Sequence, residues 1–66
     1  MNNYAFKIYN QSGVEVNQGG SAGHNCIEAF ESAIQYGMYL PRSEQCTIFA
    51  TNINNGLTIK IEAYFI

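Results

Sequence analysis

Charged side chains are scarce in this sequence. Three cations, Lys7, Arg42 and Lys60, stand against five acidic residues among 66, and the net charge is −2. Three scattered cations cannot form the basic stripe that binds the phosphates of a nucleic acid, so we expect no direct nucleic-acid partner. Five carboxylates are also too few to imitate the charge density of DNA.

Cysteine and histidine are few as well. The two cysteines, Cys26 and Cys46, allow one disulfide at most, unlike the dense frameworks of small secreted scaffolds. The only histidine, His24, lies two residues from Cys26 and far from Cys46, which is not the spacing of a structural zinc site. We therefore expect no metal, no other cofactor and reduced thiols.

Long apolar runs are missing. The longest contain a few residues, far below the roughly 20 that span a bilayer. The first four residues, Met1 to Tyr4, lack the charged and apolar regions of a signal peptide. We therefore expect no membrane partner and a cytoplasmic location.

Apolar residues are nevertheless abundant, at 47% of the chain, and 14% of the residues are aromatic. This content predicts that residues 1–66 fold as a single domain. A domain of this size buries only about 60% of the surface of its extended chain, so small folds often need a staple or a partner. With few cysteines available, docking on a larger protein or self-association would supply the missing buried area.

The C-terminal third predicts a β-hairpin. Two β-rich runs, residues 48–51 and 57–66, flank Asn55-Gly56, a dipeptide typical of two-residue hairpin turns. A turn at these residues predicts the following pairs on one apolar face, together with Ile59: Ala50 with Ile61, Ile48 with Ala63, and Cys46 with Phe65. The opposite face would carry Thr47, Phe49, Thr51 and Ile53 against Tyr64, Glu62, Lys60 and Thr58.

The N-terminal third predicts a second hairpin. Its strands would cover residues 4–9 and 14–18, with a turn at residues 10–13 in which Gly13 takes a positive φ. In this register Ile8 lies opposite Val16. The second strand is short and polar, so we expect it at an edge of the sheet.

A glycine-rich stretch and a helix lie between the hairpins. We expect residues 19–24 to form a loop that crosses to the helix, because the stretch lacks the Gly-Lys-Ser/Thr that would favour anion binding. Asn25 and Glu28 have the spacing of a capping box, and Gly37 marks the helix end. Apolar residues recur at helical spacing and predict the buried stripe: Ile27, Phe30, Ala33, Ile34 and Met38. The whole pattern predicts an α+β fold of order ββαββ, a four-stranded antiparallel sheet with one helix packed on one face.

Cys26 is the residue most suited to catalysis. It falls in the first helical turn, where the helix dipole stabilises a thiolate, and His24 is nearby in sequence. No third residue is placed to orient this pair, and the chain offers little depth for a substrate pocket. We therefore expect Cys26 to be a small apolar side chain and the protein not to be an enzyme, with a cysteine-dependent enzyme as the alternative.

Aromatic residues on the second face of the sheet are the strongest functional signal. Tyr9, Phe49 and Tyr64 should lie there, rimmed by three charged residues: Lys7, Lys60 and Glu62. An aromatic patch with such a rim is typical of a partner-binding interface. Two alternatives remain: exposed aromatic residues without a role, and a homodimer formed through the same face.

The size, the ββαββ order, Glu28-Ala29 near the helix start, and the terminal hairpin with Asn55-Gly56-Leu57 and Tyr64 resemble those of small phage-encoded anti-CRISPR proteins. This resemblance implies a non-enzymatic inhibitor, in the host cytoplasm if phage-encoded. Such an inhibitor would bind a CRISPR surveillance complex and block its DNA engagement or nuclease recruitment. The chain departs from lysine-using members in having so few cations. Residues 28–33 are also similar to the helix of HicB-type antitoxins, which implies a small homodimeric structural or antitoxin-like protein as the alternative.

Overall fold

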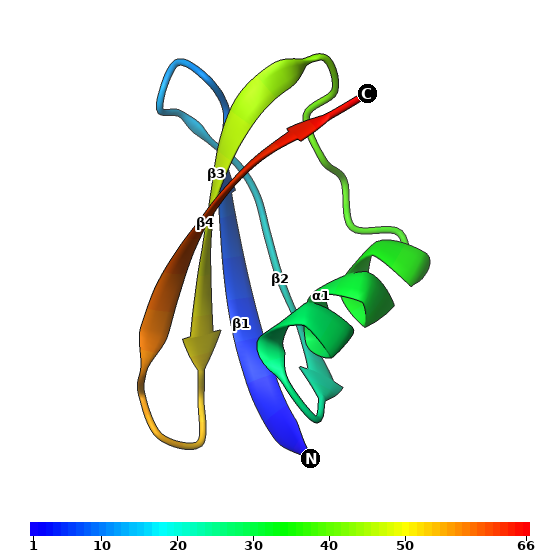
Figure 1. Ribbon diagram of the computed structural model, residues 1–66, viewed down its shortest axis with the longest axis vertical. Coiled ribbons are helices and arrows are strands. Elements are labelled where there is room, and N and C mark those ends of the chain that lie inside the picture. The colour runs from blue at the N-terminus through cyan, green and yellow to red at the C-terminus, as the bar shows by residue number, and fades with distance from the viewer.

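Alternating apolar residues form the centre of the structure, a computed structural model that describes residues 1–66. In β1 (Asn2–Tyr9) and β3 (Glu44–Asn52), every second residue is buried beneath α1 (Cys26–Gln35). With β2 (Glu15–Gly23) and β4 (Thr58–Phe65) these strands form one antiparallel sheet of order β2-β1-β3-β4 (Figure 1). The predicted ββαββ fold is confirmed, and β2 lies at an edge as expected.

The core lies between the sheet and α1. Its sheet side is made by alternate residues of the two central strands: Tyr4, Phe6, Ile8, Cys46, Ile48 and Ala50. From the helix, Ala29, Phe30 and Ala33 are buried against them. The ring of Phe30 meets that of Phe6 edge to face, with ring centroids 5.3 Å apart, which is a favourable aromatic geometry.

The glycine-rich stretch belongs to β2 and is not a loop, so this prediction was wrong. Residues 19–23 pair with the first half of β1, from Phe6↔Gly19 to Asn2↔Gly23. The last glycine, Gly23, serves packing, because the start of the helix lies directly on it. A Cβ atom on Gly23 would lie 2.6 Å from the backbone nitrogen of Ala29, closer than two such atoms can approach.

The N-terminal hairpin differs from its predicted register by one residue. Ile8 pairs with Asn17, not Val16, because a bulge interrupts the ladder between Ile8 and Tyr9. Gly13 has φ 81° in the turn, as predicted. The side chain of Asn10 accepts hydrogen bonds from the backbone N–H groups of Ser12 and Val14 and so fixes this turn.

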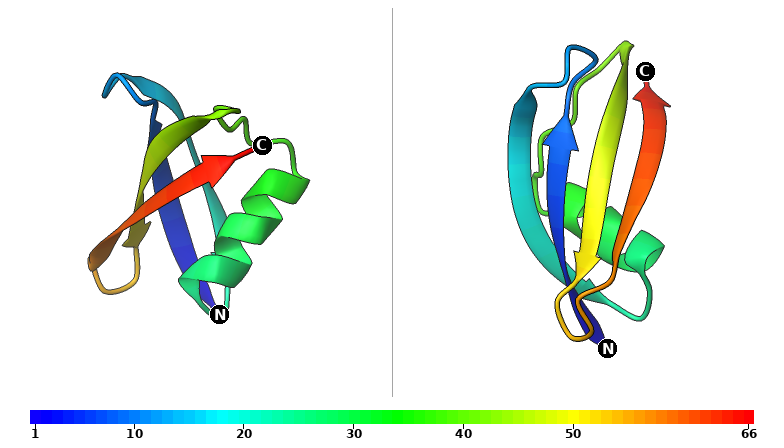
Figure 2. Two further views of the ribbon diagram at one scale, coloured as in Figure 1. Left: turned by 45° about the horizontal axis from the view of Figure 1, so that its top comes forward. Right: turned by 90° about the vertical axis from the view of Figure 1, so that its left-hand side faces the viewer.

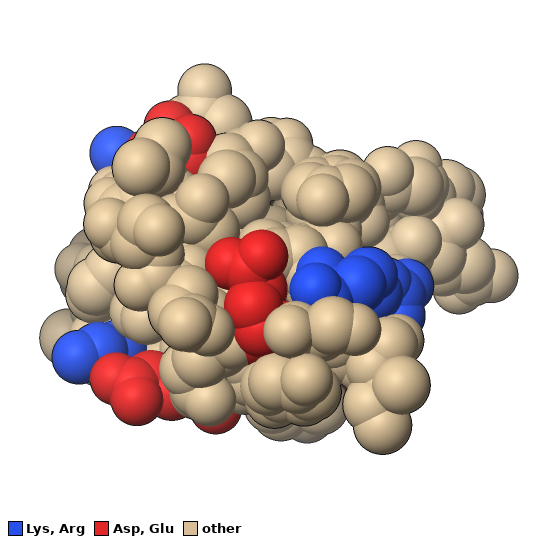
Figure 3. Space-filling view, turned by 90° about the horizontal axis from the view of Figure 1, so that it is seen from above, with Lys and Arg blue, Asp and Glu red and all other residues tan.

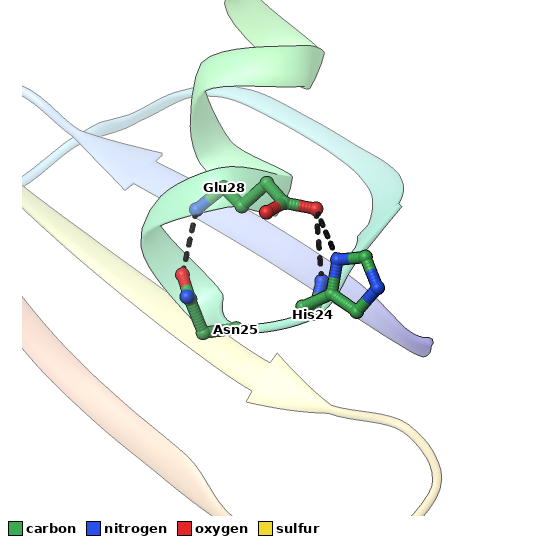
Figure 4. Close-up of polar contacts among 3 residues, drawn as sticks. All are labelled: His24, Asn25 and Glu28. Atoms are coloured by element: carbon green, nitrogen blue, oxygen red, sulfur yellow. Dashed lines mark hydrogen bonds and ion pairs between the residues drawn. The ribbon is translucent and has the colours of Figure 1, made fainter.

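Local signals define both ends of α1. The Asn25 side chain accepts a hydrogen bond from the Glu28 N–H at 2.9 Å, which confirms the predicted N-cap (Figure 4). The Glu28 carboxylate accepts from the His24 N–H and not from that of Asn25, so the reciprocal half of the capping box is moved by one residue. At the other end Gly37 has φ 97°, and bonds from Gly37 to Ile34 and from Met38 to Ala33 complete a Schellman motif.

The C-terminal hairpin is slipped by two residues from the predicted register. Its pairs are Ala50↔Ile59, Ile48↔Ile61 and Cys46↔Ala63. The turn is wider than two residues, because the Asn52 N–H bonds to the Leu57 carbonyl at 2.8 Å and asparagine side chains at 52 and 55 bond within the loop. A slip of two keeps every strand residue on its predicted face. Ile53, predicted on the outer face, lies instead in the turn.

The helix is offset toward β2, and one predicted core residue is therefore exposed. Figure 2 shows α1 crossing one side of the sheet, and its main packing partner is β2, followed by β1. Ile27 was predicted in the buried stripe, but its side chain is 60% exposed. The small residues of β2 allow the helix to approach that strand closely, and the far flank of α1 consequently loses its cover.

Candidate protein-binding surface

Two adjacent rows of residues cross the sheet on the side away from α1. In the first row Lys7 pairs with Phe49, and Phe49 pairs with Lys60. In the second row Tyr9 pairs with Thr47, which pairs with Glu62. The structure thus brings together five of the six predicted contact residues. The sixth, Tyr64, lies one step further along β4, opposite Gln45. We call this set the outer face: Lys7, Tyr9, Phe49, Lys60, Glu62 and Tyr64.

An aromatic pair occupies the centre of the outer face. The rings of Tyr9 and Phe49 meet edge to face, with ring centroids 5.6 Å apart and an interplanar angle of 88°. Both side chains are partly buried, and the Tyr9 hydroxyl donates to Glu15 on β2 at 3.4 Å. Tyr64 is 59% exposed. The pair stands on the two central strands, so backbone pairing on both sides fixes its position.

The charges around this pair are only partly compensated. Lys60 and Glu62 form an ion pair with Nζ and Oε1 3.1 Å apart, and both side chains are more than half exposed. Lys7 makes no ion pair and lies directly beside Phe49. Figure 3 views one end of the molecule, where the charged side chains form small, separate groups on a largely uncharged surface. The six residues of the outer face themselves include two lysines and one carboxylate.

A second apolar surface lies on the helix side of β4, and the sequence interpretation missed it. Ile59 is 49% exposed and Leu57 is 68% exposed on this side. Further along β4, Ile61, Ala63 and Phe65 are partly buried against the core, and the rings of Phe65 and Phe30 approach to 6.5 Å between centroids. The sequence signal for this surface was the small-residue composition of β2, because small residues let α1 pack close to β2 and away from β4. Residues 19–23 of β2 were interpreted as a loop, so the signal was missed.

The surroundings of the two cysteines favour the neutral thiol. Both thiols are free, and burial raises the pKa of Cys26 and of Cys46, which is the opposite of the activation that a thiolate nucleophile needs. His24 is engaged with Glu28: its Nδ1 lies 2.9 Å from the carboxylate (Figure 4). No hydrogen bond joins His24 to Cys26, so the pair considered for catalysis is not assembled.

The molecule has one cleft. It has a volume of about 280 Å³ and lies between β2 and the end of α1, against residues such as Gln18, Gly20, Tyr36 and Met38. No carboxylate, thiol or imidazole lines it.

No group of three or more His, Cys, Asp or Glu side chains is placed to hold a metal ion. The helix has neither the length nor the apolar character to cross a membrane.

Comparison with known proteins gave no match to a family model, to a curated protein or to a solved structure. The surface geometry described above therefore carries the functional proposal.

Proposed function

We propose that this protein is a non-enzymatic binding protein that inhibits a larger protein or protein complex by occupying part of its surface, with the outer face as the contact. The observation that carries the proposal is the Tyr9–Phe49 pair, which stands on the two central strands on the face of the sheet opposite α1. Aromatic side chains are the usual anchors of protein interfaces. This pair is ordered before binding, so little conformational entropy is lost when a partner covers it.

The charges of the outer face indicate the chemistry of the partner. Lys7 has no ion-pair partner, whereas Lys60 and Glu62 neutralise each other. A complementary surface would place an acidic side chain against Lys7 and apolar groups against Phe49 and Tyr64. Such a surface belongs to a protein, and the two lysines would not hold a nucleic-acid backbone.

The resemblance to anti-CRISPR proteins names the first partner class to test. Under this proposal the protein acts in the host cytoplasm, where its free thiols stay reduced. It would bind a CRISPR surveillance complex and block its DNA engagement or the recruitment of its nuclease. Inhibition would come from occupying a protein surface, since the outer face lacks the charge to compete as a DNA mimic.

The test compares binding by variants in which one exposed aromatic residue is replaced by threonine. A panel of purified surveillance complexes is titrated with the wild-type protein, and the binding complex is then titrated with the Phe49→Thr and Tyr64→Thr variants. Each substitution on the outer face should weaken binding by about tenfold or more, the loss typical of a truncated anchor residue. Threonine keeps strand propensity, so the sheet is retained.

Tyr39→Thr is the control. Tyr39 is 61% exposed, close to the 59% of Tyr64, but it lies in the segment between α1 and β3. Its replacement should leave binding unchanged. If folded Phe49 and Tyr64 variants bind as tightly as the wild type, the outer face is not the contact. If no complex of the panel binds, the partner class is wrong.

A further inference from the structure

The free edge of β4 is the most exposed pairing surface of the sheet. The sheet has two edge strands, β2 and β4. Helix α1 packs on β2, which also forms one wall of the cleft. No element lies beside β4, which borders the open side of the sheet in Figure 2. Edge strands in monomeric proteins are commonly protected by proline, bulges or charged side chains. β4 contains no proline, and its pairing with β3 has no bulge. Its two charged residues, Lys60 and Glu62, are of opposite sign, so they can attract a matching strand.

The hydrogen bonding of the hairpin shows which backbone groups of β4 face outward. The Asn52 N–H donates to the Leu57 carbonyl across the pair that continues the β3–β4 register. In an antiparallel pair, successive residues direct their backbone groups to alternate sides. Ile59, Ile61 and Ala63 therefore direct theirs toward β3. Lys60 and Glu62 direct theirs toward the free edge, where they can pair with another strand.

We infer that a second copy of this chain pairs antiparallel with the β4 edge about a two-fold axis at Ile61, and that the two sheets become one. In this register Lys60 lies opposite Glu62 of the second copy, and Glu62 lies opposite its Lys60. The outward backbone groups of these residues form the hydrogen-bonded pairs. Because a two-fold interface uses the same patch twice, one favourable charge pair becomes two.

Charge selects this register over its neighbours. Moving the axis one residue along β4 would place Lys60 opposite Lys60, or Glu62 opposite Glu62, and like charges directly opposite each other are destabilising. The axis at Ile61 also lies near the middle of Thr58–Phe65, so almost the whole strand pairs. The Lys60–Glu62 ion pair within one chain is solvent-exposed, so little is lost when its members also contact the second copy.

The helix side of β4 supplies the apolar part of the interface. In the same register Ile61 meets Ile61, Ile59 lies opposite Ala63, and Leu57 lies opposite Phe65 of the second copy. Ile59 and Leu57 are the side chains that the offset helix leaves exposed. The dimer therefore covers the apolar surface that a single copy cannot cover. It uses Lys60 and Glu62 of the outer face but leaves the Tyr9–Phe49 pair open, and it does not depend on the proposed function.

Charge reversal tests the register. Lys60→Glu and Glu62→Lys should each raise the dimer dissociation constant by about tenfold or more, because both cross-strand pairs become repulsive. The double variant K60E/E62K should dimerise like the wild type. An equal mixture of the two single variants should also form a heterodimer, because every charge pair is then opposite in sign. Sedimentation equilibrium distinguishes 7.4 kDa from twice that mass.

Lys7→Glu is the matched control, since it makes the same change of charge on β1, away from the edge, and should leave dimerisation unchanged. Amide hydrogen exchange of the wild type provides a second measurement that needs no variant. The Lys60 and Glu62 amides should be protected only at concentrations where the dimer forms, whereas the Ile59 and Ile61 amides should be protected at all concentrations. A wild-type protein that stays monomeric at about 1 mM would overturn the inference. A dimer that is insensitive to both charge reversals, or that protects β2 instead, would also overturn it.

Discussion

At the scale of single residues, Glu28 carries several functions of the helix start. Its backbone N–H is capped by Asn25, and its carboxylate binds both the backbone N–H and the ring of His24. These bonds favour the charged carboxylate. The backbone N–H of His24 is the larger cause and its ring the next, and together they hold the pKa of Glu28 below its ordinary value. Glu28, which the sequence identifies as part of the helix N-cap, thus also makes the stability of the fold depend on pH.

The sign of this dependence follows from the direction of the shift. The folded-state pKa is lowered, so the stabilisation is complete above the unfolded-state pKa of about 4.3 and is lost as the pH falls below it. We expect Glu28→Gln to lose less stability than the wild type between about pH 6 and pH 3. Urea unfolding followed by circular dichroism at both pH values measures the difference.

Glu31→Gln is the control for this prediction, because Glu31 lies on the exposed side of the same helix and His24 does not bond to it. It should retain the acid dependence of the wild type. If the wild type and Glu28→Gln lose the same free energy of unfolding between about pH 6 and pH 3, the His24 contacts do not stabilise the charged carboxylate.

At the scale of elements, the approach of α1 to β2 decides which surfaces remain exposed. Gly23 lies under Ala29 with no space for a Cβ atom, whereas a Cβ on Gly19 would lie 3.6 Å from the Met38 sulfur, an ordinary contact. We expect Gly23→Ala to destabilise the fold by about 1–3 kcal/mol, because the helix start must move. Gly19→Ala should be neutral or slightly stabilising.

Urea unfolding of the two glycine variants distinguishes steric need from flexibility. If the glycines served only to make the stretch flexible, as predicted for a loop, the two substitutions would have similar small effects. A large loss confined to Gly23→Ala would confirm close packing as its reason. Faster hydrogen exchange of the α1 backbone amides in Gly23→Ala than in the wild type would show that α1 is the element that moves.

The same elements show what the sequence could predict. The N-cap at Asn25, the stop at Gly37 and the turn at Gly13 depend on neighbouring residues, and all three are confirmed. The continuation of β2 through its glycines depends on pairing with β1 and on packing against α1. Neither contact is visible in the local composition, and glycine has low strand propensity. The alternation of side chains fixes the face of each strand residue but allows a slip of two. The six residues of the outer face therefore lie on the predicted side of the sheet, whereas Ile53 and the C-terminal pairing differ from the prediction.

The exposed side of β4 was hidden from the sequence for a related reason. Ile27, Ile59 and Phe30 all have the pattern of core residues, and the pattern contains no information on where along the sheet the helix lies. Its offset is set by the small residues of β2. Once the helix moves toward that strand, Phe30 remains buried while Ile27 and Ile59 are exposed. Residues predicted to form one core therefore divide into a core and a surface.

At the scale of the whole molecule, the small core makes association important. Only 12 of the 66 residues are buried, so the single copy has little apolar burial with which to oppose its conformational entropy. The β4 edge and the apolar residues beside it offer further burial without any change of fold. The free energy of unfolding should then depend on self-association. Because only folded chains dimerise, dimer formation shifts the folding equilibrium toward the folded state.

This linkage predicts that the stability of the wild type rises with its concentration. Above the dimer dissociation constant, each tenfold increase in concentration should add about 1.4 kcal/mol per dimer to the free energy of unfolding. In the Lys60→Glu variant the rise of the urea midpoint should begin only at a concentration about tenfold or more higher, whereas K60E/E62K should follow the wild type. A rise that begins at the same concentration in Lys60→Glu as in the wild type would place the association elsewhere on the molecule. A midpoint that is independent of concentration in the wild type would show that one copy of this small core is stable alone.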